Sequence, residues 1–140
     1  MLTIGRLQAV PPSLTQARRM LTQAETHLAS ARSLAPSDPE GAYALAYDAA
    51  RKALVGLLEA NGLRPTVKGG HMVVHDAALT LVGEAHAAVV GPFDRIRRRR
   101  NEVEYPSKEL PRLSPEDVEE DAVRVAAVLA LVEELLAGRG

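Results

Sequence analysis

The sequence predicts an all-α protein, built as a single up-and-down antiparallel bundle of four to five helices. Alanine and leucine, which are strong helix formers, supply much of the apolar content, whereas the chain has one Phe, three Tyr and no Trp. Proline, glycine and capping residues divide the chain into segments of helical length. Within these segments apolar residues recur every three or four positions, and no segment alternates as a strand would. Helices joined by short loops pack naturally as an up-and-down bundle.

The first two helices are predicted from their capping residues. Ser13 has Gln16 three residues later, which is the spacing of a capping box, and an amphipathic pattern follows it. Asp38 followed by Pro39 opens the second helix, and Asn61 with the glycine after it marks the end. Because the second segment is apolar on more than one side, we expect it to be central in the bundle.

Three more helices are expected in the second half of the chain. One covers about residues 71–82, and Gly83 weakens its continuation. The next begins at Pro92 and ends near residue 105, because the residue before Pro106 resists helical geometry. Ser114, with a proline and two acidic residues after it, opens the last helix.

Length, charge and hydropathy limit the class of protein. The 140 residues fit one domain, so we expect a single bundle over residues 1–140, with 1–12 as a short N-terminal extension. The absence of cysteine excludes disulfides, cysteine-ligated zinc and thiol nucleophiles. A formal net charge of −1 argues against nucleic-acid binding by the whole surface. With no secretory signal in the first residues and no apolar run long enough for a bilayer, we expect a cytoplasmic protein without membrane contact.

The sharpest functional feature is the arginine-rich helix over residues 92–105. Phe93, Ile96 and Val103 form an apolar stripe, and the position that completes its spacing is Arg100. A charge on an apolar stripe is costly unless it is paired or faces a wet cleft. We therefore expect Arg100 to have a specific partner.

The other charged residues of this helix fall on two further faces. Arg97, Asn101 and Tyr105 are spaced four apart and are therefore neighbours on one flank. Three arginines and a glutamate lie on the opposite, solvent side: Arg95, Arg98, Arg99 and Glu102. These three arginines either bind a ligand, stay solvated, or pair with the acidic residues of 116–121 at the start of the last helix.

From about residue 13 to residue 136, the chain resembles HEPN domains. The resemblance rests on the order of helices, on the segment 42–54 with the helix start at 70–71, and on the run Arg100-Asn101-x-x-x-Tyr105-Pro106. The family motif is an arginine, a polar residue and then a histidine four to six positions after the arginine. In members that cut RNA, this implies a metal-independent ribonuclease whose paired sites lie in a cleft between two subunits. The arginine steadies a phosphate there, and the histidine helps move the proton of the ribose 2′-hydroxyl.

Carried onto this chain, Arg100 and Asn101 match the arginine and the polar residue, while Tyr105 stands where the histidine should be. No histidine follows Arg100, since the last one is His86. Tyrosine has a pKa near 10, so holding its phenolate at neutral pH costs about 4 kcal/mol. We therefore expect little or no catalysis, whereas the grip of Arg97, Arg100 and Asn101 on a phosphate does not depend on the histidine.

Three functions follow from this pattern. The leading hypothesis is a HEPN-like homodimer that binds RNA or a nucleotide-bearing partner through Arg100, Asn101 and Tyr105. The first alternative is an active endoribonuclease toxin of a toxin–antitoxin pair, with a minimal nucleotidyltransferase as its partner, as the family resemblance implies. The second is a protein-interaction module, in which the arginines only tie subunits together.

We expect structural roles for the remaining histidines and tyrosines. His71 and His75 are four apart on a helix, a spacing that can hold a metal, but two ligands do not define a site. We therefore expect no metal and no cofactor, and capping or packing roles for this pair. His27 is isolated in the sequence. Two tyrosines four apart are expected in the core or in an interface: Tyr43 and Tyr47.

Overall fold

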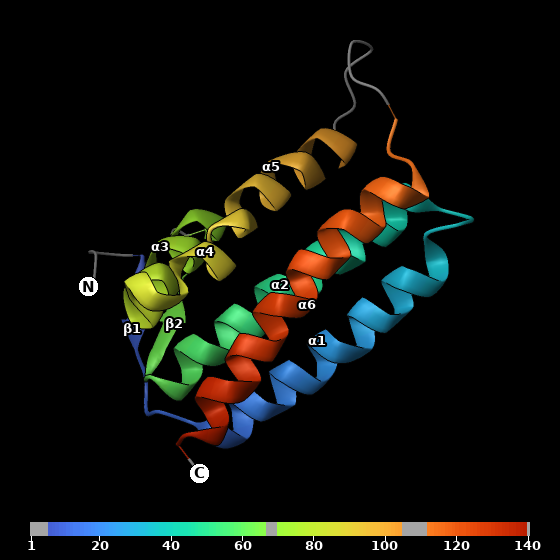
Figure 1. Ribbon diagram of the computed structural model, residues 1–140. Helices are drawn as coiled ribbons and strands as arrows, with labels where there is room; N and C mark the ends of the chain where they lie inside the picture. The colour runs from blue at the N-terminus through green and yellow to red at the C-terminus, as the bar shows by residue number, and fades with distance from the viewer. Residues whose placement is uncertain (1–5, 67–69, 105–111, 140) are drawn as a thin grey trace.

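The protein, described here from a computed structural model over residues 6–66, 70–104 and 112–139, is an all-α up-and-down bundle (Figure 1). The long helices are α1 (Leu14–Leu34), α2 (Pro39–Ala60), α5 (Pro92–Glu104) and α6 (Pro115–Ala137). α1, α2 and α6 pack side by side, with α1 antiparallel to the other two, and α5 runs back along α2 and α6. The predicted fold class is confirmed.

Each long helix begins where the sequence predicted it. The Ser13 hydroxyl accepts the backbone N–H three residues on at 3.1 Å, and the Asp38 carboxylate accepts the N–H of Gly41 at 3.0 Å. At α6 the cap is reciprocal, because Ser114 accepts the N–H of Asp117 at 3.1 Å and donates its own N–H to that carboxylate at 2.9 Å. Such caps stabilise a helix by about 1 kcal/mol each. They therefore set the ends of the helices independently of the core.

Three further helical elements lie between α2 and α5: α3 (Gly70–Val82), a 3-10 turn (Glu84–His86) and α4 (Ala87–Val90). Gly83 breaks the chain after α3 with a φ of 72°, a conformation that favours glycine. In the part of the chain described, no single helix is long and apolar enough to cross a membrane. By length and composition only the bent pair Met72–Val82 and Glu84–Glu102 qualifies, and it turns by 113° at its break.

A small antiparallel sheet joins β1 (Leu7–Ala9) to β2 (Leu63–Pro65). The prediction that the chain has no strand is therefore wrong here. Strands of three residues are too short to show alternation, and their pairing joins segments more than fifty residues apart. The turn at Gly62, whose φ is 74°, leads from α2 into β2. Leu7 is buried against Leu58, so part of the predicted N-terminal extension belongs to the fold.

The core is centred on α2, as its apolar pattern predicted. Its buried residues face α1 and α6 on one side, and α3 and α5 on the other. At the seam with α1 the backbones approach so closely that a Cβ on Gly56 would lie 3.0 Å from the carbonyl oxygen of Ala17. On the side that faces α5, α2 presents two buried tyrosines, and these position the candidate site: Tyr43 and Tyr47.

Candidate nucleic-acid-binding site

α5 is anchored on α2 through a stack of aromatic rings. The ring of Phe93 lies 5.4 Å from that of Tyr47, with an interplanar angle of 13°, and 6.3 Å from that of His75 in α3. Phe93 and Ile96 are fully buried, which confirms the predicted inner stripe over the described side chains. Stacked aromatic pairs add about 0.5–1.5 kcal/mol beyond the area that they bury. The first half of α5 is thus fixed against α2.

In the second half of α5, two successive arginines lie over the two tyrosines of α2. The guanidinium carbon of Arg99 is 5.8 Å from the centre of the Tyr43 ring, and that of Arg100 is 5.6 Å from the centre of the Tyr47 ring. A guanidinium at this distance from an aromatic face gains about 0.5–2 kcal/mol, depending on how far it is desolvated. The specific partner expected for Arg100 is thus the face of a buried tyrosine.

Asp121 of α6 is the centre of the polar network at this end of the bundle. Its carboxylate is 1% exposed and accepts the hydroxyl proton of Tyr43 at 2.7 Å. Arg95 and Arg124 each donate to its Oδ1 at 2.7 Å, and Arg99 donates to its Oδ2 at 3.5 Å. A buried carboxylate is stable only with such partners. This network joins α2, α5 and α6.

The arginines expected on the solvent side divide into two groups. Arg95 and Arg99 pair with α6, since Arg99 also lies 3.4 Å from Asp117, which confirms the ion-paired interpretation for these two. Arg98 pairs instead with Asp94 of its own helix, at 3.4 Å, and its side chain is 64% exposed. Arg95 and Arg99 therefore hold the fold together, while Arg98 contributes mainly charge to the surface.

The flank predicted to contact nucleic acid is only partly described. Arg97 is 20% exposed and donates twice to Asp94, at 3.2 and 3.0 Å. Asn101 is half-buried, and within the described part of the chain its side-chain amide makes no hydrogen bond. Tyr105 lies outside the described residues. Arg97, Arg100 and Asn101 thus follow one another along the side of α5 that borders Tyr47.

The same cations act on the hydroxyl groups of the two tyrosines. Burial raises the pKa of Tyr43, and the hydrogen bond to Asp121 raises it further. Burial also raises the pKa of Tyr47 to about 12, although the guanidiniums of Arg51, Arg100 and Arg97 act in the opposite direction. Neither tyrosine of α2 is therefore a base near neutral pH. Arg51 of α2 and the two arginines of α5 thus act on the same hydroxyl group.

Arg51 belongs to a second cluster, which the sequence did not reveal. Asp48 of α2 accepts from Nδ1 of His27 at 3.0 Å and from Arg51 at 3.1 Å, and Lys52 lies 3.9 Å away. His27 is isolated in the sequence but is paired across the α1–α2 seam. The spacing of Asp48 and Lys52 at four residues was a signal, because such pairs meet on a helix face.

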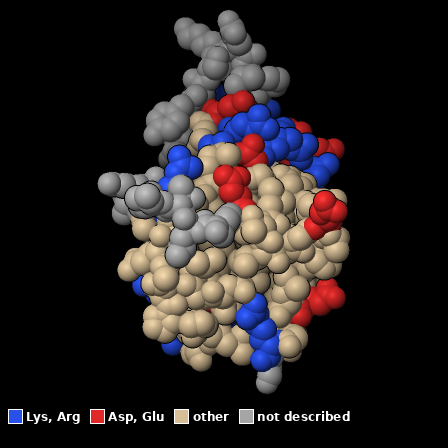
Figure 2. Space-filling model, turned by 90° about the vertical axis from the view of Figure 1, so that its left-hand side faces the viewer, with Lys and Arg blue, Asp and Glu red and all other residues tan. Residues whose placement is uncertain are grey.

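The charged groups gather at one end of the molecule. In Figure 2 the basic and acidic side chains are interleaved in one cluster near the top of the face shown, and the surface below it is largely uncharged. The uncharged part agrees with the composition of α3 and α4, which together contain Asp76 as their one acidic residue and no Lys or Arg. Although the net charge of the whole chain is near zero, arginine is therefore concentrated in one part of it.

No metal site is found among the described residues, where no three His, Cys, Asp or Glu side chains converge. His75, one of the two histidines considered for a metal, packs on Phe93, as expected from its second interpretation. Both of its ring nitrogens are buried without a hydrogen-bond partner in the described part of the chain, although Nδ1 lies 3.5 Å from Asp76. The side chain of His71 lies outside the part described.

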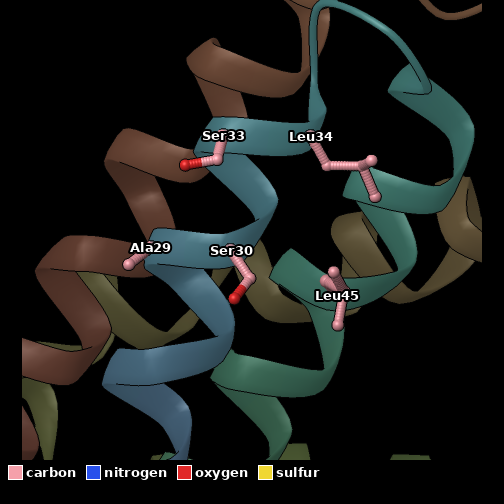
Figure 3. A pocket seen from close by; sticks show the side chains of 5 residues that line it. All are labelled: Ala29, Ser30, Ser33, Leu34 and Leu45. Carbon is pink, nitrogen blue, oxygen red and sulfur yellow. The ribbon is translucent and has the colours of Figure 1, made fainter.

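An open hollow of about 470 Å³ lies between α1 and α2, away from the arginines (Figure 3). It is lined by Ala29, Ser30, Ser33, Leu34 and Leu45. These side chains are small or apolar and carry no charge. The hollow therefore has no cation in its lining that could bind an anion as the arginines of α5 can.

Comparison of the chain with known protein families, with curated proteins and with solved structures finds no match. The resemblance to HEPN domains thus stays a prediction from the sequence.

Proposed function

We propose that this chain is a HEPN-like domain that forms a homodimer and binds RNA through Arg97, Arg100 and Asn101, with little or no catalysis. The observation that carries RNA binding is the concentration of guanidinium groups at one end of the bundle. Five arginines there share three aspartates: Arg95, Arg97, Arg98, Arg99 and Arg124 with Asp94, Asp117 and Asp121. Arg100 adds a sixth guanidinium, and guanidinium groups are well suited to bind phosphate.

The position of Arg100 supports its role as the central phosphate contact. The Tyr47 ring beneath it orients the guanidinium, and Phe93 holds that ring in turn. A planar, pre-oriented guanidinium loses less conformational entropy when it binds an oxyanion than a free side chain does. The amide of Asn101, next along the helix, adds donors for the same phosphate or for its ribose.

Weak or absent catalysis follows from the residue at the motif position. Tyr105 replaces the family histidine, and the ordinary pKa of tyrosine is about three units above neutrality, whereas that of histidine is near 6.5. A substitution of Tyr105→His should then raise the cleavage of single-stranded RNA. Robust cleavage by the native protein without metal, abolished by Arg100→Ala, would instead establish the ribonuclease.

RNA binding is tested by comparing two neighbouring arginines in fluorescence anisotropy with labelled single-stranded RNA. Arg100→Ala should weaken binding about ten- to a hundredfold, which corresponds to the loss of one charge-assisted contact of about 1.5–3 kcal/mol. The matched control Arg98→Ala removes the same charge from a side chain that is 64% exposed, and should mainly reduce the salt dependence. Equal, small effects of both substitutions would contradict the proposal.

Dimerisation is tested separately. The family resemblance implies a cleft shared by two subunits, and most small homo-oligomers are closed twofold dimers. Light scattering at micromolar concentration should therefore give about twice the mass of the chain. A monomeric mass across this range would remove the shared cleft while leaving RNA binding by one subunit to be judged on its own test.

A further inference from the structure

The cations around Tyr47 come from two helices rather than from α5 alone. Arg100 lies over the ring, and Arg97 is one turn before it on α5. Arg51 is one turn after Tyr47 on α2, and α2 and α5 are held together at this level by the stack of Tyr47 on Phe93. The three guanidiniums act together on the Tyr47 hydroxyl, where each lowers the pKa that burial raises. They therefore converge on one region of the surface.

Among the described side chains of this region, each carboxylate is shared by more than one cation. Asp48 pairs with Arg51 and Lys52 as well as His27, and Asp94 pairs with Arg97 and Arg98. These two carboxylates thus face four permanent cations. The side chains of Arg51, Lys52 and Arg97 are only 31%, 22% and 20% exposed, so their charges are less screened by water than those of ordinary surface residues.

Convergent cations favour one kind of phosphate. A site that follows the backbone of a nucleic-acid strand distributes its cations along a groove, with one negative charge to meet at each phosphodiester. A cluster with a local surplus of charge is matched better by a group that carries two negative charges. A phosphate monoester is such a group near neutral pH, because its second pKa is about 6.

We propose that Arg51, Arg97 and Arg100 form a site for the terminal phosphate monoester of an RNA strand. This inference rests on the proposed function and deepens it: the protein distinguishes RNA by the chemistry of its ends. Arg51 is the determinant that the family motif does not contain. It lies outside α5, so its removal leaves Arg100 and Asn101 in place.

The test uses three short single-stranded RNAs of one sequence with an internal label. One carries a 5′-phosphate, one carries a 3′-phosphate, and one has hydroxyl groups at both ends. The native protein should bind one of the phosphorylated RNAs about tenfold more tightly than the hydroxyl form, as expected for one added charge-assisted contact. The phosphorylated end that is preferred identifies the polarity of the strand in the site.

Arg51→Gln should remove most of this preference while changing the affinity for the hydroxyl RNA less than about threefold, the size of a weak surface electrostatic effect. Arg51→Lys keeps the charge and should retain part of the preference, which guards against a mere effect on folding. Arg18→Gln is the matched control, because Arg18 is a paired arginine of α1 that is 43% exposed and lies outside the cluster. It should leave both affinities unchanged.

Two results would overturn the inference. One is equal affinity of the native protein for all three RNAs, and the other is a preference that survives Arg51→Gln. In both cases RNA is still bound, so the proposed function stands. If the native protein binds none of the three RNAs, the proposed function fails, and the inference fails with it.

Discussion

Two carboxylates are buried in the part of the chain that the structure describes, and they are satisfied in different ways. Glu59, at the end of α2, is 4% exposed and receives two hydrogen bonds from Arg64, at 2.7 and 3.3 Å. Asp121, near the start of α6, receives Tyr43 and three arginines from two helices. The first pair is local, since its members are five residues apart, and its charges cancel. The second joins three helices and brings three arginines to one carboxylate.

This difference separates two uses of the same interaction. A carboxylate matched by one arginine closes a turn and leaves no net charge. A carboxylate shared by several arginines fixes the backbone of α5 and also keeps cations near the surface, where an anion can reach them. The end of the bundle that contains Asp121 therefore holds α2, α5 and α6 together and also carries the candidate binding site.

The largest expected effect is on stability, from removal of the carboxylate of Asp121. Asp121→Ala should lower the free energy of unfolding by about 3 kcal/mol or more, because it leaves the buried hydroxyl of Tyr43 and several arginines without their acceptor. Glu59→Ala should cost about 1–2 kcal/mol, because Arg64 is half exposed and regains water. Urea denaturation of both variants measures the two losses. An equal or larger loss for Glu59→Ala would contradict the comparison.

A smaller effect is expected from the hydroxyl that joins α2 to Asp121. Tyr43→Phe keeps the ring beneath Arg99 but removes the hydrogen bond of 2.7 Å, so the free energy of unfolding should fall by about 1–2 kcal/mol. A double-mutant cycle with Asp121→Ala, which removes the acceptor, isolates this bond. If the two substitutions are additive, the hydroxyl does not stabilise the carboxylate.

Acid should lower the stability of the bundle at the start of α6. The pKa of Asp117 is lowered, first by the backbone N–H of Ser114 and also by Arg99. A lowered pKa in the folded state means that the contribution of this carboxylate is fully present above the ordinary aspartate pKa of about 4, and is lost as the pH falls through the lowered value. The deficit of Asp117→Asn, measured by urea denaturation, should therefore be seen at neutral pH and disappear in strong acid. A deficit that is independent of pH would assign the effect to something other than ionisation.

The smallest effect is expected at Arg98. Its ion pair with Asp94 is 3.4 Å long and its side chain is 64% exposed, so Arg98→Ala should change the free energy of unfolding by less than about 0.5 kcal/mol. Thermal melting against the native protein checks this. A loss comparable to that of Tyr43→Phe would mean that Arg98 belongs to the structural arginines after all.

The features that could be predicted from the sequence are those that depend on residues close together in the chain. The caps at Ser13, Asp38 and Ser114 are local hydrogen bonds, and the helices begin where these residues stand. The placement of Arg100 on the inner stripe followed from helical spacing, and the structure confirmed it with Tyr47 as the partner. The two short strands could not be predicted, because their pairing joins segments more than fifty residues apart.

Long-range partners explain what was missed in the site. Tyr43 and Asp121 are 78 residues apart, and no local pattern connects them. One signal was nonetheless present, because Asp121 lies three residues after Val118 and four before Val125, on the apolar stripe of its own helix. The argument that singled out Arg100 applies to Asp121 with the sign of the charge reversed. The proposed role of Arg51 could not be predicted from the sequence, because it depends on how α5 packs on α2.

The network around Asp121 also divides tolerance to mutation unevenly between its members. Four donors converge on this one carboxylate, so the loss of any single donor leaves three in place. The loss of the acceptor, Asp121, in contrast leaves all four donors without their partner. Over evolutionary time, Arg95 and Arg99 can therefore be exchanged one at a time, as long as the aspartate persists. A single buried oxygen pair thus allows the outer face of the helix to diversify without a change of fold.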